Sequence, residues 1–544
     1  MKIALAQINT IVGDLAGNAE KMLSFYKEAV SNGVAMVIFP ELSICGYPPE
    51  DLIIKRHFLE DCAMAIKQLA RQTGPVAMVA GFPCASGKRR YNSLAILADG
   101  KIKVRYDKME LPNYGVFDEI RYFDRGESLV CAQIGGVRVG LSICEDIWSP
   151  EHVERLKEHI IGTDFLINIS ASPFHKGKIG ERKDIISACS RELGLPVFYC
   201  NMVGGQDELV FDGRSIITDK SGRIIAKAKY FEEDIIYADF ERESGRIVAC
   251  QEKALQPRSI TEEVYEALVC GTRDYIRKNG FKKVVIGLSG GIDSALVATI
   301  AVKALGPDSV VGVTMPSKYN TTETISDAEQ LAANLGIEFH TIPIGGPLAA
   351  MHEALGAIPG WDDTKTAYEN LQARIRGTIL MSMSNQFGYI VLTTGNKSET
   401  AVGYSTLYGD TAGGFAVIKD VPKTLVYELC RFINDSFGEL IPETTITRAP
   451  SAELRDGQLD SDSLPDYDSL DAIIRGYVEQ DKSADELLAE GLEADEINRV
   501  LRLIDLNEYK RRQSPPGLKI TPKAFGRDRR LPITNKYRSQ VKTP

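Results

Sequence analysis

Short hydrophobic runs alternate with amphipathic stretches along the first half of the chain. Runs of this length, rich in Val, Ile and Phe, predict strands that are buried on one or both faces. Between the first two runs, apolar residues at helical spacing, among them Met22 and Tyr26, predict a helix over 18–33 that ends at Gly33. The predicted strands are 2–8, 34–39, 76–82, 93–99, 101–107, 137–143, 165–170 and 197–201. This alternation indicates a layered α/β fold.

The second half repeats a pattern of strand, turn and helix, which is typical of a parallel, doubly wound sheet. Its clearest unit is a hydrophobic strand over 282–289, a glycine turn and a helix over 293–306. The same alternation predicts helices and strands at 261–280, 310–316, 324–336, 338–342 and 389–395. We therefore expect a Rossmann-like sheet in this half.

A polar stretch separates the two halves. Residues 240–260 turn polar and contain Pro257, a composition typical of a boundary between domains. We therefore expect a first domain over 1–248, a linker over 249–260 and a second domain over 261–544. With 544 residues, the chain is long enough for two large α/β domains.

Composition and charge exclude several classes of protein. With 44% hydrophobic and 25% charged residues, the chain is globular rather than disordered. Its formal net charge of −10 disfavours non-specific attraction to nucleic acid. No apolar run approaches the roughly 18 residues of a spanning helix, and the first residues contain no cleavage signal. We expect a cytoplasmic protein with neither nucleic-acid nor membrane partners.

Three residues suited to chemistry each follow a predicted strand: Glu41, Lys108 and Cys144. The ten cysteines form no C-x-x-C pair, so no zinc site or disulfide framework is predicted, and nine are expected to be small buried residues. Side chains at strand ends of an α/β sheet converge on one edge. A thiol needs a neighbouring base or cation to become a nucleophile; Glu41 is suited to take the proton, and Lys108 to hold an oxyanion.

The surroundings of these residues resemble the nitrilase-type amidohydrolases, in the branch that serves as a glutaminase. Four blocks in matching order carry the resemblance: FPELSICGYPPEDL (39–52), YDKMELPNYGVFDEIRYF (106–123), LSICEDIW (141–148) and NISASPFHKGK (168–178). The resemblance implies an αββα sandwich, with Glu41 as general base, Lys108 as charge stabiliser and Cys144 as the nucleophile that forms a γ-glutamyl thioester.

The same resemblance suggests which residues contact glutamine: Tyr114, Ser172 and Lys178. The local spacing allows Lys176 in place of Lys178, and this alternative stays open. Glu145, next to the nucleophile, is either a ligand for the substrate's ammonium group or a structural carboxylate.

The segment GLSGGIDS (287–294) lies between a predicted strand and a predicted helix, where backbone N–H groups form an anion site. It lacks the lysine of a Walker A loop. It does match G-x-S-x-G, with Ser289 as an esterase nucleophile and His340 or His352 as partners, an interpretation that we disfavour. The segment resembles instead the pyrophosphate loop of ligases that cleave ATP between the α and β phosphates, and an acid at Asp293 suits Mg²⁺.

Further blocks resemble the NAD synthetase family, in order and over nearly the whole second half. They are MPSKYNTTETISDAEQLAANLGI (315–337), ENLQARIRG (369–377), LTTGNKSE (392–399), GYSTLYGDTAGGF (403–415) and NEYKRRQSPPGLK (507–519). The resemblance implies substrates ATP and deamido-NAD⁺ and the cofactor Mg²⁺. It assigns ATP to Gly287, Leu288, Ser289, Gly290, Gly291, Ile292, Asp293, Ser294 and Thr394, deamido-NAD⁺ to Asn370, Glu399 and Lys510, and Mg²⁺ to Asp293 and Glu399.

Together the halves predict a glutamine-dependent synthetase in which ammonia passes from one domain to the other. Neutral NH₃ must be shielded from water, so we expect a closed passage and an assembly of identical chains. Three alternatives are an amidotransferase with another carboxylate acceptor, a tRNA-modifying pyrophosphatase, favoured by the basic tail at 510–542, and an interaction module fused to a nucleotide sensor. The ENLQARIRG and LTTGNKSE blocks argue against the first, and the net charge against the second.

Overall fold

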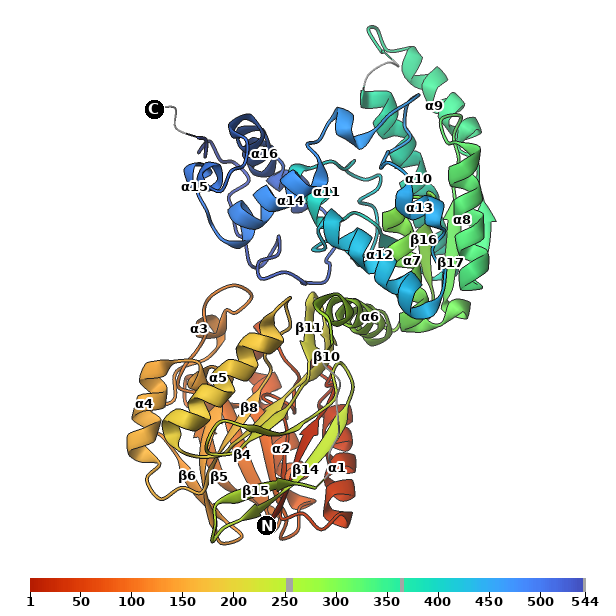
Figure 1. Ribbon diagram of the computed structural model, residues 1–544. Coiled ribbons are helices and arrows are strands. Elements are labelled where there is room, and N and C mark those ends of the chain that lie inside the picture. Colours follow the sequence, from red (N-terminus) through yellow and green to blue (C-terminus); the bar gives the residue numbers. More distant parts are fainter. Residues whose placement is uncertain (251–257, 363–365, 542–544) are drawn as a thin grey trace. The chain divides into compact units, whose positions relative to one another are not determined.

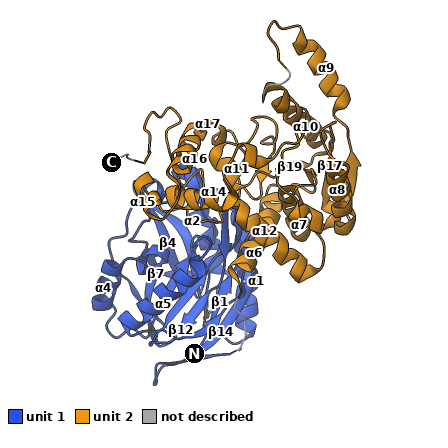
Figure 2. Cartoon of the chain, turned by 45° about the horizontal axis from the view of Figure 1, so that its top comes forward, with its two compact units in different colours: residues 1–258 blue, residues 259–544 orange. Residues whose placement is uncertain are grey.

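The computed structural model describes residues 1–250, 258–362 and 366–541. The chain divides into two units, Met1–Arg258 and Ser259–Pro544 (Figure 2). Most of the predicted linker, residues 251–257, lies outside the described residues. In the described residues, no helix is both long and apolar enough to cross a membrane.

Two sheets form the centre of the first unit (Figure 1). One has the strand order β15-β14-β1-β2-β3-β4-β5. Its strands are β1 (Lys2–Gln7), β2 (Met36–Ile38), β3 (Ala77–Ser86), β4 (Arg89–Ala98), β5 (Lys101–Asp107), β14 (Asp234–Glu241) and β15 (Arg246–Ala249). The other has the order β13-β12-β9-β8-β7-β6. Its strands are β6 (Cys131–Ile134), β7 (Val137–Ile143), β8 (Phe165–Ser170), β9 (Val197–Asn201), β12 (Ile216–Thr218) and β13 (Ile224–Lys227), while β10 (Val203–Gln206) and β11 (Leu209–Asp212) form a separate hairpin.

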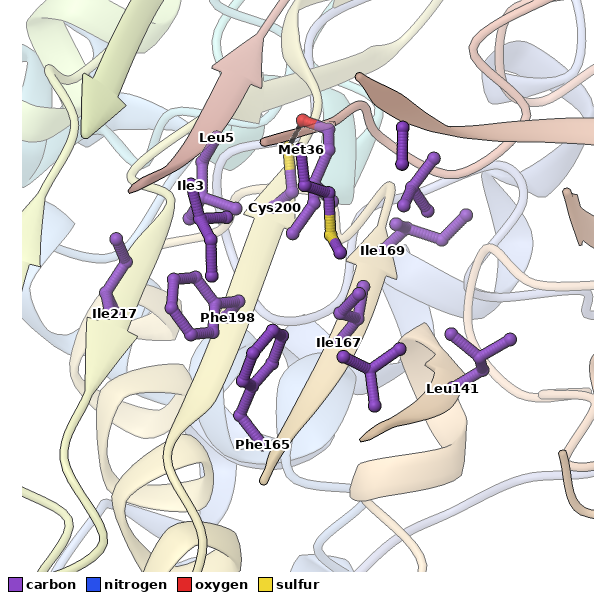
Figure 3. Packing of buried hydrophobic residues seen from close by; sticks show 14 of the residues in the cluster. Ile3, Leu5, Met36, Leu141, Phe165, Ile167, Ile169, Phe198, Cys200 and Ile217 are labelled. Atoms are coloured by element: carbon purple, nitrogen blue, oxygen red, sulfur yellow. Dashed lines mark hydrogen bonds between the residues drawn. The ribbon is translucent and has the colours of Figure 1, made fainter. Parts of the chain in front are cut away.

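Alternation of side chains along the strands explains how the layers pack. On β1, Ile3 and Leu5 belong to the core between the two sheets, together with Phe165 and Phe198 (Figure 3). The intervening Ala4 belongs to a second core, against the helices. A strand with apolar residues at successive positions therefore buries both faces, and each large side chain contributes about 1.5–3 kcal/mol.

Helices cover the outer faces of both sheets, which confirms the αββα sandwich. They are α1 (Leu15–Ser31), α2 (Arg56–Arg71), α4 (Pro150–His159) and α5 (Lys178–Leu193), and a short α3 (Glu119–Tyr122) lies among the loops. Residues of α1 and α2 share a core with the first sheet, and residues of α4 and α5 share one with the second. The helix predicted over 18–33 begins earlier, at Leu15, because the Asp14 side chain accepts the N–H of Gly17 and caps it.

The first strand of the chain lies inside its sheet rather than at the edge. β1 pairs in parallel with β2 and antiparallel with β14, in a register that sets Lys2 opposite Asp239. The hydrogen bonding along one edge of β1 thus depends on a partner strand more than 200 residues later in the sequence.

The second unit contains the expected parallel sheet, with the order β18-β17-β16-β19-β20. Its strands are β16 (Val284–Gly287), β17 (Val310–Thr314), β18 (Glu338–Thr341), β19 (Ile390–Thr393) and β20 (Phe415–Ala416). The strand order reverses between β16 and β19, and doubly wound sheets bind ligands at such a point. The glycine segment begins at the last residue of β16, and the LTTGNKSE block begins in the last two residues of β19, so both sequences lie at this reversal.

Helices surround this sheet, and a helical cluster with a core of its own follows it (Figure 1). Around the sheet lie α6 (Ile260–Lys278), α7 (Ile292–Leu305), α8 (Thr322–Leu335), α9 (Gly345–Gly356), α10 (Thr366–Phe387), α12 (Lys423–Phe437) and α13 (Glu443–Thr447), whereas α11 (Lys397–Val402) contributes Ala401 and Val402 to the core of the cluster. The cluster contains α14 (Tyr467–Ile474), α15 (Ala484–Ala489), α16 (Ala494–Leu506) and α17 (Glu508–Arg511).

Candidate functional site

The structure places Glu41, Lys108 and Cys144 where strands of the first unit end. Glu41 lies three residues after β2, and Lys108 and Cys144 directly follow β5 and β7. All three side chains are buried, with at most 4% of any of these residues exposed. Because β2 and β5 belong to one sheet and β7 to the other, the three residues converge from both layers of the sandwich.

A buried network of charges connects the first two residues. The Lys108 ammonium donates to Glu41 Oε1 at 2.8 Å and to both oxygens of Glu119 at 2.9 Å. Glu119, the first residue of α3, also accepts a hydrogen bond from the Tyr47 hydroxyl at 3.0 Å. One cation is thus held between two carboxylates, which compensates its burial.

Two further donors fix the Glu41 carboxylate. The Asn92 amide on β4 donates to Oε1 at 2.7 Å, and the Ala171 N–H donates to Oε2 at 2.8 Å. Oε1 therefore receives two donors, from Asn92 and Lys108, whereas Oε2 receives one. The carboxylate keeps a lone pair on Oε2 with which to accept a proton.

The backbone and the surroundings of Cys144 are unusual. Its φ is +42°, a left-handed conformation that is rare outside glycine, at the first residue of the 3₁₀ turn Cys144–Ile147. Burial raises the pKa of the Cys144 thiol well above its usual value; the charge of Glu41 adds to this shift and that of Lys108 opposes it. The thiol is consequently protonated until a base removes its proton.

The three residues expected to contact glutamine lie near this centre. The Tyr114 hydroxyl donates to Glu145 at 3.1 Å, and Ser172 is buried on the loop after β8. Lys178, the first residue of α5, lies over the Trp148 ring at 3.8 Å from the ring centroid. Burial lowers the pKa of Lys178, and the neighbouring carboxylate of Glu181 opposes this shift.

The geometry bears on two questions that the sequence leaves open. Lys178 is partly buried and close enough to Cys144 to interact with its thiolate form, whereas Lys176 is exposed to solvent, which favours Lys178 as the contact. Glu145 accepts from Tyr114, and burial raises the pKa of its carboxyl while Lys108 opposes this. Its carboxylate is thus part of the same cluster as the expected glutamine contacts.

Sequence reasoning missed Glu119 and Asn92. Glu119 lies inside the block 106–123, eleven residues after Lys108, where it reads as one more acidic residue in a polar loop. Asn92 lies 51 residues from Glu41 along the chain, on a strand whose pattern indicates only a core position. Neither residue carries a local signal of its role, which appears only once the fold brings it against Lys108 or Glu41.

In the second unit, all but one of the sequence-predicted residues line a cavity of about 350 Å³. It is lined by the whole segment Gly287–Ser294 and by Thr394, Glu399 and Lys510. Asn370 does not line the cavity; its Oδ1 accepts the Thr406 hydroxyl at 2.7 Å instead. Neither His340 nor His352 lines it, so the esterase interpretation of Ser289 finds no base there.

The glycine segment turns the chain from β16 into α7 and lines the cavity at the N-terminal end of that helix. Gly290 has φ +80°, and a Cβ at this position would lie 2.1 Å from the Thr324 carbonyl oxygen. Ser294 donates to the Gly291 carbonyl at 2.9 Å and stabilises the first turn of the helix. The segment thus has both the conformation and the close approach that require glycine.

Asp293 and Glu399 lie together at the cavity, linked by a lysine that sequence reasoning did not single out. Lys423 Nζ lies 2.5 Å from Asp293 Oδ2 and 3.6 Å from Glu399 Oε1. Asn396 donates to Asp293 Oδ1 at 2.9 Å and also caps α11. Burial and the charge of Asp293 raise the pKa of Glu399 to about 8, although Lys423 opposes the shift.

Two carboxylates and a bound triphosphate would together suit Mg²⁺, which binds through one or two carboxylates plus substrate phosphates. Within the described residues, no group of three or more His, Cys, Asp or Glu side chains is arranged to hold a metal by itself. The donor set therefore fits an ion that arrives with a nucleotide. Lys510 completes the cavity wall, and its ammonium donates to the carbonyls of Gly403 and Ser405 at 2.7 and 2.8 Å.

Comparison with known proteins matches both units and their order. The carbon-nitrogen hydrolase family model matches residues 2–248, and the NAD synthase model matches residues 264–514. The glutamine-dependent NAD(+) synthetase of Thermotoga maritima is 45% identical over 99% of this chain and 100% of its own length. The enzyme of the same name from Aquifex aeolicus is also 45% identical, with 99% and 100% covered.

Solved structures agree with these matches. The glutamine-dependent NAD⁺ synthetase of Acinetobacter baumannii, solved in complex with ADP, has a TM-score of 0.79 at 40% identity and covers 99% of both chains. That of Cytophaga hutchinsonii has a TM-score of 0.83 at 24% identity over 98% of both chains, a likeness of fold alone. Matches of this extent favour the NAD synthetase interpretation over another acceptor acid or tRNA. The chain belongs to the family of glutamine-dependent NAD⁺ synthetases, ATP-dependent ligases in which a glutaminase domain of the carbon-nitrogen hydrolase type precedes an NAD synthase domain.

Proposed function

We propose that Glu41, Lys108 and Cys144 are the catalytic triad of the glutaminase domain. The observation that carries this proposal is the buried Lys108 ammonium, held between Glu41 and Glu119 close to the buried Cys144 thiol. Glu41 Oε2 takes the thiol proton as Cys144 Sγ attacks the side-chain amide carbon of glutamine. Lys108 stabilises the oxyanion that forms on the amide oxygen.

The intermediate then collapses in two steps. Glu41 returns the proton to the amide nitrogen, the carbon–nitrogen bond breaks, and NH₃ leaves a γ-glutamyl thioester on Cys144. Water attacks the thioester and gives a proton to Glu41, the carbon–sulfur bond breaks to release glutamate, and Glu41 returns the proton to the Cys144 sulfur to regenerate the thiol. Tyr114, Ser172 and Lys178 hold the amino acid part of the substrate.

Trapping the thioester tests this mechanism. The protein is mixed with glutamine, quenched in acid, digested and analysed by mass spectrometry. We expect one glutamyl group on the peptide that contains Cys144, and none on the same peptide from the Cys144→Ala variant. A glutamyl group on another cysteine would contradict the assignment.

In the second unit, we propose that Gly287–Ser294 and Thr394 bind the phosphates of ATP at the point where the strand order reverses. The N-terminus of α7 and the loop N–H groups favour the triphosphate. The nicotinic acid carboxylate of deamido-NAD⁺ attacks the α-phosphorus, the bond to pyrophosphate breaks, and an acyl adenylate forms. Ammonia then attacks the acyl carbon, and AMP leaves as the carboxamide forms.

We assign Mg²⁺ to Asp293 and Glu399, which the Asn396 amide and the capped start of α11 hold in place. When bound, the ion neutralises phosphate charge as pyrophosphate leaves. Lys423 balances the two carboxylates from its position on α12. Deamido-NAD⁺ is assigned to Asn370, Glu399 and Lys510, of which Asn370 needs a movement to reach the cavity, because it does not line it.

We further propose that the chain works in the cytoplasm as an assembly of identical copies. All ten cysteines are free, as is usual in a reducing compartment. Large apolar side chains are exposed on and beside α9 and α10, namely Met351, Ile358, Met381 and Phe387, and such groups support self-association. Light scattering coupled to size-exclusion chromatography tests the assembly, and a mass equal to one chain would contradict it.

A further inference from the structure

A buried ion pair lies beneath Ser172, and the proposed mechanism does not use it. Arg182 on α5 donates from Nη1 and Nη2 to the two oxygens of Asp212, the last residue of β11, at 2.7 and 2.9 Å. Only 1% of Arg182 and none of Asp212 is exposed. Such a pair is expensive to bury, and apolar residues of the same volume often serve stability equally well. Stability alone therefore does not explain why this ion pair is buried next to Ser172.

The remaining donors of Arg182 hold Ser172. Nε donates to the Ser172 hydroxyl oxygen, and Nη2 donates to the Ser172 carbonyl, both at 3.3 Å. From the other side, Asn201 accepts the Ser172 N–H at 2.9 Å and donates to its carbonyl at 3.4 Å. Every polar group of Ser172 is thus engaged by a buried side chain.

The contact with arginine fixes the role of the serine hydroxyl. A guanidinium has only donors, so the Ser172 oxygen accepts from Arg182 and its hydrogen stays available. Among the described residues, no group accepts that hydrogen. The hydroxyl is therefore presented as a donor, which suits an anionic partner and not a cationic one.

The same helix supplies a second group for an anion. Lys178 lies four residues before Arg182 on α5, so the two lie on one face of the helix. Lys178 lies over the Trp148 ring, while Arg182 extends into the core. A hydroxyl donor and an ammonium thus belong to one rigid element and its neighbouring loop.

We propose that Arg182, anchored by Asp212, is a positioning residue that fixes the Ser172 hydroxyl as a donor to the α-carboxylate of glutamine. It sets the preference of the glutaminase domain for amides that bear a carboxylate over simple amides. This inference rests on the proposed function, in which Ser172 contacts glutamine. Arg182 itself touches no reacting atom and acts through Ser172.

The test compares two amides. Glutamine and 4-aminobutanamide, which is glutamine without its carboxylate, are hydrolysed by the full chain, and the release of ammonia gives kcat and KM for each. We expect Ser172→Ala to raise the KM for glutamine about tenfold or more, the usual value of a hydrogen bond to a charged group, and to leave that for 4-aminobutanamide unchanged. Arg182→Lys should produce the same selective effect, since lysine cannot reproduce the arginine fork.

A double variant and a control sharpen the comparison. Because both changes remove one interaction, the double variant of Ser172 and Arg182 should be no worse than Ser172→Ala alone. Arg191→Lys, on the exposed side of the same helix, is the matched control and should change neither KM. The melting temperature shows whether Arg182→Lys still folds. If it does not, the variant Arg182→Met combined with Asp212→Leu, which removes both charges together, is tested in its place.

Two results would overturn the proposal: an equal rise in KM for both amides, or effects of Ser172 and Arg182 that multiply in the double variant. Failure of the proposed mechanism looks different. If Cys144→Ala still hydrolyses glutamine, the nucleophile is wrong, whereas the preference between the two amides still reports on Arg182.

Discussion

At the scale of single residues, Cys144 needs its neighbours to become a nucleophile. Burial keeps the thiol protonated, and only a thiolate is strongly nucleophilic. Glu41 accepts two hydrogen bonds on one oxygen and one on the other, and Lys108 offers a charge for the oxyanion. Removal of the proton and attack on the amide are thus expected to occur together, on a bound substrate.

Replacing Cys144 separates the two activities of the chain. We expect Cys144→Ala to abolish NAD⁺ formation from glutamine and to leave formation from added ammonium intact, because the second unit needs only the nitrogen. NAD⁺ is measured with each nitrogen source in the presence of ATP, Mg²⁺ and deamido-NAD⁺.

The matched control is Cys200→Ala, a buried cysteine of β9 in the core between the sheets. It should lower the melting temperature and keep the use of glutamine. Full glutamine use by Cys144→Ala would show that another residue is the nucleophile.

Changing Asp293 should impair NAD⁺ formation from glutamine and from added ammonium alike. Asp293→Ala takes away a carboxylate that contacts Lys423 and Asn396 at the nucleotide cavity, so we expect NAD⁺ formation to fall at least about a hundredfold with either nitrogen source. The measurement is the same as for Cys144. Loss with glutamine alone would place Asp293 outside the adenylation step.

The pKa of Glu119 makes stability depend on pH. Burial raises this pKa to about 7; Lys108 opposes the shift and Glu41 adds to it. A carboxyl with a higher pKa in the folded state stabilises the fold at low pH, and this contribution is lost as pH rises through about 7. The glutamine of Glu119→Gln does not titrate. The free energy of unfolding of the variant, relative to that of the wild type, should therefore increase by about 3 kcal/mol between pH 4.5 and pH 8.

Denaturant unfolding at several pH values measures this difference, and the exposed Glu158→Gln gives the baseline slope. A difference between Glu119→Gln and the wild type that stays constant with pH would mean that Glu119 is already ionised throughout.

At the scale of elements, the turn from β16 into α7 makes the strictest demand on sequence. Gly290→Ala would place a methyl group against the Thr324 carbonyl in a left-handed conformation, so the loop must move away from the nucleotide. We expect NAD⁺ formation to fall with both nitrogen sources, with a weaker affinity for ATP measured by calorimetry. Gly280→Ala is the control, since its φ is also +80° but no atom lies within 4 Å of the added group.

The hydrophobic pattern predicts those strands whose own sequence shows a continuous or alternating apolar run. The predicted strands 101–107, 137–143, 165–170 and 197–201 coincide with β5, β7, β8 and β9, because continuous apolar or alternating runs are bounded by turns. Strands β10 to β13 were not predicted. They have three or four residues each, and their existence depends on partners elsewhere in the chain rather than on a local pattern.

The sites divide in the same way. Residues inside strand-end motifs, such as Cys144 and Asp293, could be named from sequence because a short segment fixes both the residue and its element. Asn92, Lys423 and Arg182 could not, since each acts on a group 10 to 130 residues away and looks like an ordinary polar residue in its own segment. Asn370 shows the reverse: a sequence block names it, yet its amide bonds to Thr406 outside the cavity lining.

At the scale of the whole molecule, the proposed reaction depends on ammonia that does not mix with solvent. Glutamine labelled with ¹⁵N in its side chain is supplied together with a large pool of unlabelled ammonium, and NAD⁺ is analysed by mass spectrometry. We expect the carboxamide to be enriched in ¹⁵N well above the pool, because free NH₃ at neutral pH is mostly protonated and loses its lone pair.

Cys144→Ala should give NAD⁺ with the isotope content of the pool alone. Dilution of the label to that content in the wild type would mean that ammonia leaves the protein before it is used.

The pairing of β1 with β14 has a consequence for how the chain is made. The first strand to leave the ribosome waits for a partner at residues 234–241, so its open edge stays available for wrong pairing throughout synthesis of the glutaminase unit. At about 5–20 residues per second, this interval is on the order of ten to fifty seconds. Nascent chains stalled before residue 234 should therefore bind chaperones and be digested by protease, and chains stalled after the whole unit has emerged should resist both.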